Sequence, residues 1–238
     1  RSYDFICRFQ GIKSDVKTIN VNPALSWKVN DQFALGAGVN WQHIKATFTS
    51  MVNYSGALAQ AAGQAAAQGA IPADLVPSII GATSGLQSKS TVDGSDSAWG
   101  WNVGMLWDLN PATRVGLSYR SPMKFKVSGN VGFDNPAPSV PAPLAPVVGL
   151  LAQQVNSVAL YNSGINADIK LPDTANLSIF QSINDRWDWM ADVQWTGWSS
   201  LQNLTFVRST GSVLQSTPEN FDDTWRFAVG ATYKYNDQ

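Results

Sequence analysis

Seven segments of the chain alternate regularly between apolar and polar residues, and one of the two resulting faces carries no charge except Asp173 at the start of one segment. In residues 113–127 the odd positions are apolar or hydroxylated, whereas Arg114, Arg120, Lys124 and Lys126 occupy even positions. Because successive side chains of a β-strand point to opposite faces, this segment has one apolar face and one cationic face. The same period of two occurs in residues 18–29, 33–43, 97–109, 173–183, 187–196 and 224–235.

The polar face of these segments carries ten of their eleven charged residues, namely Lys28, Asp108, Arg114, Arg120, Lys124, Lys126, Asp188, Asp192, Arg226 and Lys234; the exception is Asp173, the first residue of its segment. The apolar face is crowded with Trp and Tyr, and most of the 10 Trp residues lie near predicted strand ends. The core of a soluble β-sandwich is filled mainly by aliphatic residues and Phe. Aromatic girdles therefore indicate an all-β, transmembrane antiparallel β-barrel, with the apolar face toward lipid and the polar face toward the lumen.

Composition excludes several other classes of protein. A formal net charge of −1 and the absence of a basic cluster argue against nucleic-acid binding. The single cysteine, Cys7, excludes an internal disulfide framework. No apolar run reaches the length of a transmembrane helix. Metal-ligand clusters of Cys and His are absent, as are acidic calcium loops, so we expect no cofactor.

Short and long connections alternate along the chain. Asn- and Asp-containing turns follow every second predicted strand, at residues 29–32, 109–112, 183–186 and 235–238. In outer-membrane barrels the short turns are periplasmic, so the long loops 49–96 and 131–166 are expected on the extracellular side. We expect two short helices in the first loop, within 55–70 and 71–85, and one helix over 147–161 in the second. A third loop, near 209–220, is short and polar.

The two long loops are almost uncharged, which is unusual for segments that only contact water. Their apolar residues are candidates for a ligand groove, and we select Leu75, Ile79, Val148, Leu151 and Val155. The competing interpretation is that the two loops pack on each other as a lid. The two interpretations are compatible, because a mutual contact can also form an apolar groove.

Three stretches carry a resemblance to a known family: VKTINVNPALSWKVNDQFALGAGVNW, WGWNVGMLWDLNPATRVGLSYRSPMKFKVSG, and LPDTANLSIFQSINDRWDWMADVQWTGWSSL followed by FDDTWRFAVGATYKYND. The block from Leu106 to Gly129 is the most specific. The chain resembles the long-chain fatty-acid outer-membrane transporters of the FadL type, whose relatives include aromatic-hydrocarbon transporters. The resemblance implies about seven central strands of a fourteen-stranded barrel, with an N-terminal hatch and the C-terminal strands outside residues 1–238. It also implies ligand capture by the extracellular loops and a lumen pocket with basic side chains.

Four cations on the polar face are candidates for holding a ligand carboxylate inside the barrel: Arg120, Arg226, Lys124 and Lys126. The alternative is a salt-bridge network in the lumen with Asp188 and Asp192. Gly36 and Gly38 lie on the same lumen face and allow something inside the barrel to approach the wall closely.

These observations favour a transporter for passive uptake of hydrophobic compounds, with long-chain fatty acids as ligands and lateral release into lipid. The expected location is the bacterial outer membrane, where a monomer crosses several times and contacts lipid. The alternative is a surface adhesion or structural barrel without a transport role. An enzyme is not expected, because the only histidine, His43, falls on the lipid-facing phase of its strand.

Overall fold

The computed structural model describes residues 6–235, which contain mainly β-strands. Its elements, in chain order, are η1 (Ile6–Phe9), β1 (Lys13–Val21), β2 (Ala24–Lys28), β3 (Phe33–Asn53), α1 (Tyr54–Ala67), α2 (Leu75–Ala82), β4 (Gln87–Asn110), β5 (Thr113–Arg120), β6 (Met123–Asp134), α3 (Ala145–Val158), β7 (Ser163–Leu171), β8 (Thr174–Ser182), β9 (Trp187–Thr196), η2 (Trp198–Ser200), β10 (Asn203–Arg208), β11 (Val213–Pro218) and β12 (Thr224–Tyr233). The chain forms two compact units. The first unit comprises residues 1–17, 45–95 and 128–165, and the second unit comprises residues 18–44, 96–127 and 166–238.

Within residues 6–235, the sheet contains twelve strands in the order β11-β10-β7-β6-β4-β5-β8-β9-β12, with β3 beside β4, and β1 and β2 both beside β3. The twelve strands form seven long lines, because five lines consist of two strands separated by a break. This agrees with the seven strands expected from the alternating pattern. The hairpin of β10 and β11 was not predicted, and these strands include part of the segment interpreted as a third polar loop.

Four of the breaks lie level with one another in the second unit. They are residues 121–122, 172–173, 197–202 and 219–223, and we call this row the seam. The strand ends that border it are in register, because Arg120 pairs with Thr174, Thr174 with Thr196, and Thr196 with Thr224. Pro122 and Pro172 lie within the seam, where a missing backbone N–H removes no ladder hydrogen bond.

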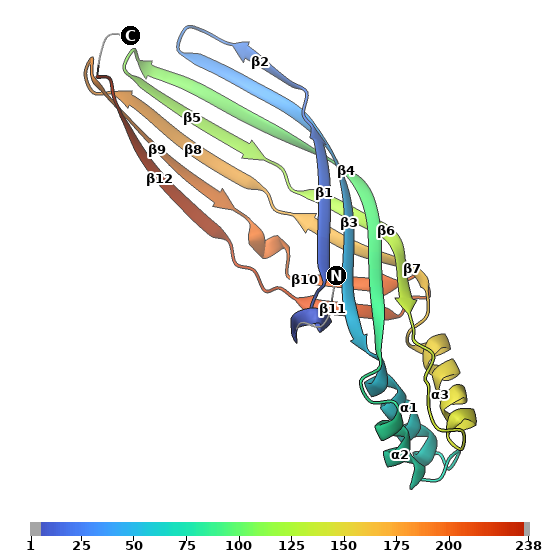
Figure 1. The fold of residues 1–238 in the computed structure, drawn as a ribbon. Helices are drawn as coiled ribbons and strands as arrows, with labels where there is room; N and C mark the ends of the chain where they lie inside the picture. Colours follow the sequence, from blue (N-terminus) through green and yellow to red (C-terminus); the bar gives the residue numbers. More distant parts are fainter. Residues whose placement is uncertain (1–5, 236–238) are drawn as a thin grey trace. The chain divides into compact units, whose positions relative to one another are not determined.

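On the side of the seam that faces the short turns, called below the seam from here on and drawn toward the upper left in Figure 1, β5, β8, β9 and β12 lie side by side in a regular antiparallel ladder. Residues paired across strands share one face of a sheet. Leu117 pairs with Leu177, Leu177 with Val193, and Val193 with Phe227, so the apolar face is continuous from strand to strand. The two-face assignment made from the sequence is therefore confirmed for these four strands.

The apolar face carries two rows of aromatic side chains. One row follows the seam and contains Trp101, Tyr119, Trp195 and Trp225; the other lies toward the short turns and contains Trp107, Trp187 and Tyr233. Trp187 and Trp195 are the two ends of this pattern on β9. Eight residues at about 3.3 Å each separate them by roughly 26 Å along the strand, which at the tilt of about 40° usual in outer-membrane barrels spans roughly 20 Å of the apolar band.

The first unit contains the three helices, which lie close together (Figure 1). All three were expected, although α3 begins and ends two or three residues earlier than the segment 147–161. Gly69 and Gly85 follow α1 and α2 with φ values of +70° and +80°, a left-handed conformation that glycine adopts without strain. The long loops are shorter than predicted, since β3 extends to Asn53 and β4 already begins at Gln87.

Across residues 6–235, no helix combines the length and the apolar character that a membrane span requires. The turn expected at 235–238 lies mostly outside the described residues. Cys7 is exposed and free.

Candidate ligand-binding site

Arg120 is the centre of an amide-rich cluster on the polar face of the second unit. Its guanidinium donates to the Oδ1 of Asn40 at 2.6 Å and, more weakly, to the Oδ1 of Asn20 at 3.5 Å. Asn40 is fully buried, and its Nδ2 donates to the Oδ1 of Asn102 at 2.9 Å. The guanidinium is therefore oriented by neutral amides from three different strands.

No carboxylate neutralises Arg120 in the part of the chain that the structure describes. The alternative of a salt-bridge network required pairing with Asp188 or Asp192. Asp188 instead pairs with Lys234 at 2.9 Å and accepts a short hydrogen bond from Ser182, while Asp192 accepts from Ser178. Arg120 is exposed, so guanidinium N–H groups remain available to a further acceptor.

Gly38 is adjacent to this cluster and shows how closely the strands approach. A Cβ at this position would lie 2.6 Å from the Oδ1 of Asn22 and 2.8 Å from the Oδ1 of Asn102. A side chain there would displace the Asn102 amide and weaken its hydrogen bond from Asn40. The expectation that lumen-face glycines permit a close approach is met at Gly38, where the approaching groups belong to the protein itself.

A hollow of about 480 Å³ lies on the same face, and Arg120 is not among the residues that line it. Ser118, two residues before Arg120, lines it, and the floor includes Gly36, Gly104 and Gly116. The glycines leave space because no side chain projects from them, and Leu106 contributes an apolar wall. Its volume falls within the range of small-molecule sites, so the geometry combines a cation with an apolar hollow.

Arg226 shares the polar face with Arg120 but lies in another part of it. It pairs with Gln194 on β9 and has no ion pair among the described residues. Three strand spacings separate β5 from β12, which amounts to about 14 Å. Arg120 is two residues from Ser118, which lines the hollow, whereas Arg226 is two strands from Asn176, which also lines it.

The face predicted for Lys124 and Lys126 is wrong. Met123 lies against the polar-face side of Gly100, since a Cβ on that glycine would be 2.9 Å from the Met123 Cε. Met123, Phe125 and Val127 form a buried apolar cluster with Ile44 and Ala98 on that side. The two lysines alternate with these residues, so they project from the face that carries Trp99 and Trp101. The break at residues 121–122 reverses which alternate positions face the lumen. The sequence pattern, which was read straight through this break, could not detect the reversal.

The predicted loop residues come together, although they form a core and not an open groove. Ile79, Val148, Leu151 and Val155 are buried in one cluster with Tyr54 and Leu58, and Leu75 packs at its edge. The hydroxyl of Tyr54 donates to the Oδ1 of Asn156 at 2.9 Å, and burial raises the pKa of Tyr54. A ligand can reach the four buried side chains only when the helices separate, so their role in binding stays a prediction.

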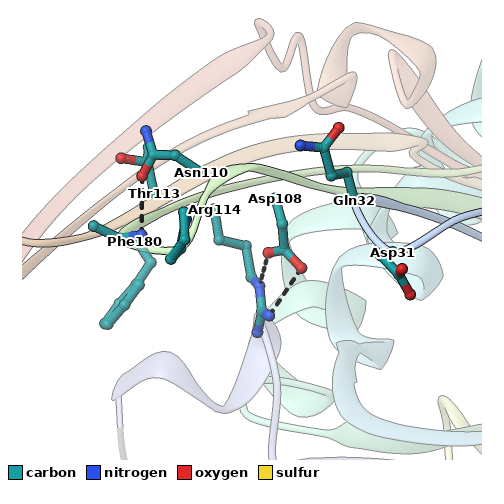
Figure 2. A pocket seen from close by; sticks show the side chains of 9 residues that line it. Asp31, Gln32, Asp108, Asn110, Thr113, Arg114 and Phe180 are labelled. Carbon is teal, nitrogen blue, oxygen red and sulfur yellow. Dashed lines mark hydrogen bonds and ion pairs between the residues drawn. The ribbon is translucent and has the colours of Figure 1, made fainter.

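Two other hollows were not predicted. One, of about 570 Å³, lies between Pro136–Pro138 and α3 and is lined by Ala152 and Asn156. The other, of about 390 Å³, lies at the short turns, where the Asp108 carboxylate receives two hydrogen bonds from Arg114 (Figure 2). Because Arg114 is already neutralised there, this second hollow offers no spare cation to an anionic ligand.

His43 is on the apolar face, as expected. Its Nδ1 lies 3.0 Å from the Oγ of Ser97, and its ring stacks on Trp41. No His, Cys, Asp and Glu cluster suited to a metal ion occurs within residues 6–235.

The whole chain, residues 1–238, matches the family described as outer membrane protein transport protein (OMPP1/FadL/TodX). The chain belongs to this family of outer-membrane β-barrel transport proteins, and its strands are outer-membrane strands. This agrees with the resemblance found in the sequence.

Individual relatives support the same assignment. The long-chain fatty acid transport protein of Escherichia coli O6:H1 is 26% identical over 230 residues, which are 95% of this chain and 48% of that protein. Outer membrane protein P1 of Haemophilus influenzae strain Rd is 27% identical over 233 residues, covering 96% of this chain and 46% of the relative. The chain thus spans about half the length of the curated relatives it matches.

Solved structures share the fold. A FadL homologue of Pseudomonas aeruginosa superposes with a TM-score of 0.75 at 25% identity, over 100% of this chain and 50% of that one. The Ralstonia pickettii toluene transporter TbuX gives a TM-score of 0.61 at 22% identity, over 94% of this chain and 53% of its own.

Proposed function

We propose that this chain is part of a transporter for passive uptake of long-chain fatty acids and related hydrophobic molecules across the outer membrane. The ligand is captured by the helical loops, binds in the lumen with its carboxylate at Arg120, and leaves laterally into lipid. Relatives named as long-chain fatty acid transport proteins agree with this ligand class. The hydrophobic molecules carried by the whole protein are therefore expected to be amphiphiles with an acidic head.

The observation that carries the proposal is Arg120, which no carboxylate among the described residues neutralises and which is two residues along β5 from the hollow-lining Ser118. An arginine whose partners are neutral amides keeps its full charge for a ligand, and its planar fork matches the two oxygens of a carboxylate. The floor offers room to an alkyl chain, since Gly104 and Gly116 present only backbone beside Leu106, and Ser118, Asn176 and Ser178 also line the hollow. A neutral hydrocarbon would gain from the hollow but would leave the cation unpaired.

The helical loops suit the first capture step. Leu150 and Val158 on α3 are about 70% exposed, although they lie on a helix that is otherwise amphipathic. The neighbouring hollow beside Pro136–Pro138 has an apolar contribution from Ala152. Exposed apolar side chains next to a hollow are typical of a binding surface, and an alkyl chain removed from water there gains roughly 25 cal/mol per Å².

Filling the hollow tests the proposal directly. In the full-length protein, Gly116→Leu places an isobutyl group in the hollow; a Cβ there meets only Leu106 and Ser178, at 3.7 and 3.9 Å. Uptake of labelled oleate should fall strongly in cells that depend on this protein. The control is Thr232→Leu, which places the same leucine side chain on the same face of β12, outside the hollow. Unchanged uptake in a folded Gly116→Leu variant would overturn the lumen site.

A further inference from the structure

Two lysines on the lipid-facing side stand next to the aromatic row at the seam. Lys124 and Lys126 lie on β6, on the face that also carries Trp99 and Trp101, as the contact between Met123 and Gly100 shows. Trp99 is 68% exposed and Trp101 49%. Tryptophan collects at the level where hydrocarbon gives way to head groups, so both ammonium groups lie close to that level.

The two lysines remain available for a ligand. Both are exposed, and neither has an ion pair within residues 6–235. The carboxylate of Asp96 accepts a hydrogen bond from the backbone N–H of Lys126 at 2.6 Å. On β7, Asp168 and Lys170 share this outward face and offset one another, because Ile169 and Leu171 pack with the inward cluster. One net positive charge or more therefore remains.

Neutral polar groups extend the site. The ring of His43 and the hydroxyl of Ser97 are hydrogen-bonded at 3.0 Å on the same lipid-facing phase, two residues from Trp99 along β4. Hydroxyl and ammonium donors beside tryptophan form a surface that is apolar on the hydrocarbon side and rich in donors on the head-group side. Phosphate, with several acceptor oxygens and a full negative charge, complements it.

The orientation of the strands selects the leaflet. The short turns are at the other end of β4 and β5, and short turns are periplasmic in outer-membrane barrels. The seam is therefore on the outer side. We infer that Lys124 and Lys126, with Ser97 and His43, bind the phosphate groups of phosphorylated outer-leaflet lipid, of the lipid A type. This site is independent of the proposed uptake function and would persist if that proposal failed.

The test measures lipid binding to the full-length protein in detergent. Bisphosphorylated lipid A is the probe, and dephosphorylated lipid A is the reference ligand. A lysine at an anionic lipid surface contributes about a fivefold change in affinity. Lys124→Gln and Lys126→Gln should each weaken binding of the bisphosphorylated form by about that factor, and the double variant by about 25-fold. Lys28→Gln, at the last residue of β2 and beside a short turn at the opposite end, should leave it unchanged.

Three results would overturn the inference. They are a double variant that binds like the wild type, a wild type that does not distinguish the two lipids, and competition by millimolar inorganic phosphate as effective as that by the lipid. Lys-to-Gln changes at exposed positions leave the strand pairing intact, and heat-modifiable mobility in gels verifies that the barrel is folded. Loss of binding in a folded double variant, with dephosphorylated lipid A unaffected, supports the site.

Discussion

Arg120→Gln separates recognition of a head group from burial of an alkyl chain. The change removes the positive charge and most of the donors but keeps a polar side chain of similar reach. The strand is not expected to rearrange, because Arg120 is exposed and its backbone pairs with Asn102 and Thr174. Asn40 loses one donor while its hydrogen bond to Asn102 remains available.

The expected loss follows from the number and kind of contacts. A hydrogen bond that involves a charged group contributes about 1.5–3 kcal/mol, which corresponds to roughly a 10- to 150-fold change in dissociation constant. Arg120 faces solvent in the empty lumen, and solvent screening favours the lower end of this range. We therefore expect palmitate to bind about tenfold more weakly to the variant.

Methyl palmitate is the internal reference, because it fills the same hollow without a negative charge. Binding of acid and ester is compared by displacement of a fluorescent fatty acid from wild type, Arg120→Gln and Arg226→Gln. Only the binding of the acid to the Arg120→Gln variant should weaken, because Arg226 is three strands away from Arg120. Equal binding of acid and ester to the wild type would refute head-group recognition and favour a neutral hydrocarbon as ligand. An equal loss in both arginine variants would refute the assignment to Arg120 alone.

Three further predictions concern other parts of the chain. Leu117→Arg places a charge toward lipid and should lower the stability of the folded barrel by roughly 2–4 kcal/mol, whereas Ser118→Arg places the charge toward the lumen and should be tolerated. The yields of folded protein in bilayers compare the two variants, and equal yields would refute the assignment of the two faces. Leu151→Asp buries a charge in the helical cluster and should reduce oleate uptake while the barrel still folds, which heat-modifiable mobility verifies; unchanged uptake would exclude a role for this cluster. The raised pKa of Tyr54 gives stability that is complete below the unfolded pKa, near 10, and is lost as pH rises through the folded value. Limited proteolysis of the loops should therefore accelerate above about pH 10 in wild type, and a Tyr54→Phe variant that accelerates equally would contradict this cause.

The alternating pattern predicted the faces correctly wherever the ladder is continuous. On β9 and β12 the sequence alone separated the tryptophans from Asp192 and Arg226, because nothing interrupts the period of two. The pattern failed after Pro122, where a two-residue break shifts the phase. Met123, Phe125 and Val127 are apolar in either phase, so an inward apolar cluster could not be distinguished from a lipid-facing row.

The lumen site was only partly predictable, since it depends on strand register. Arg120 was identified from its charge and its position on the polar face. Its partners Asn40 and Asn102 come from β3 and β4, and no periodicity indicates that these amides meet. The hollow was not predicted because Gly104 and Gly116 shape it by having no side chains. The space they leave becomes a cavity only when neighbouring strands are aligned. The sequence signal that could have indicated the hollow is the recurrence of glycines at lumen-facing positions of neighbouring strands.

The seam also divides the second unit into blocks of different cooperativity. Below it, the ladder of β5, β8, β9 and β12 is continuous, and opening one strand would expose backbone groups to hydrocarbon. At the seam the regular ladder gives way to isolated backbone hydrogen bonds, such as that from Gly197 to Asp173, and to side-chain contacts: Asp223 accepts from the N–H of Ser199, and Gln202 donates to the carbonyl of Phe221. A local opening of β10 and β11 therefore stops there. Amide exchange should be fast above this row and slow below it, so the segment above can fluctuate while the membrane-embedded wall stays closed.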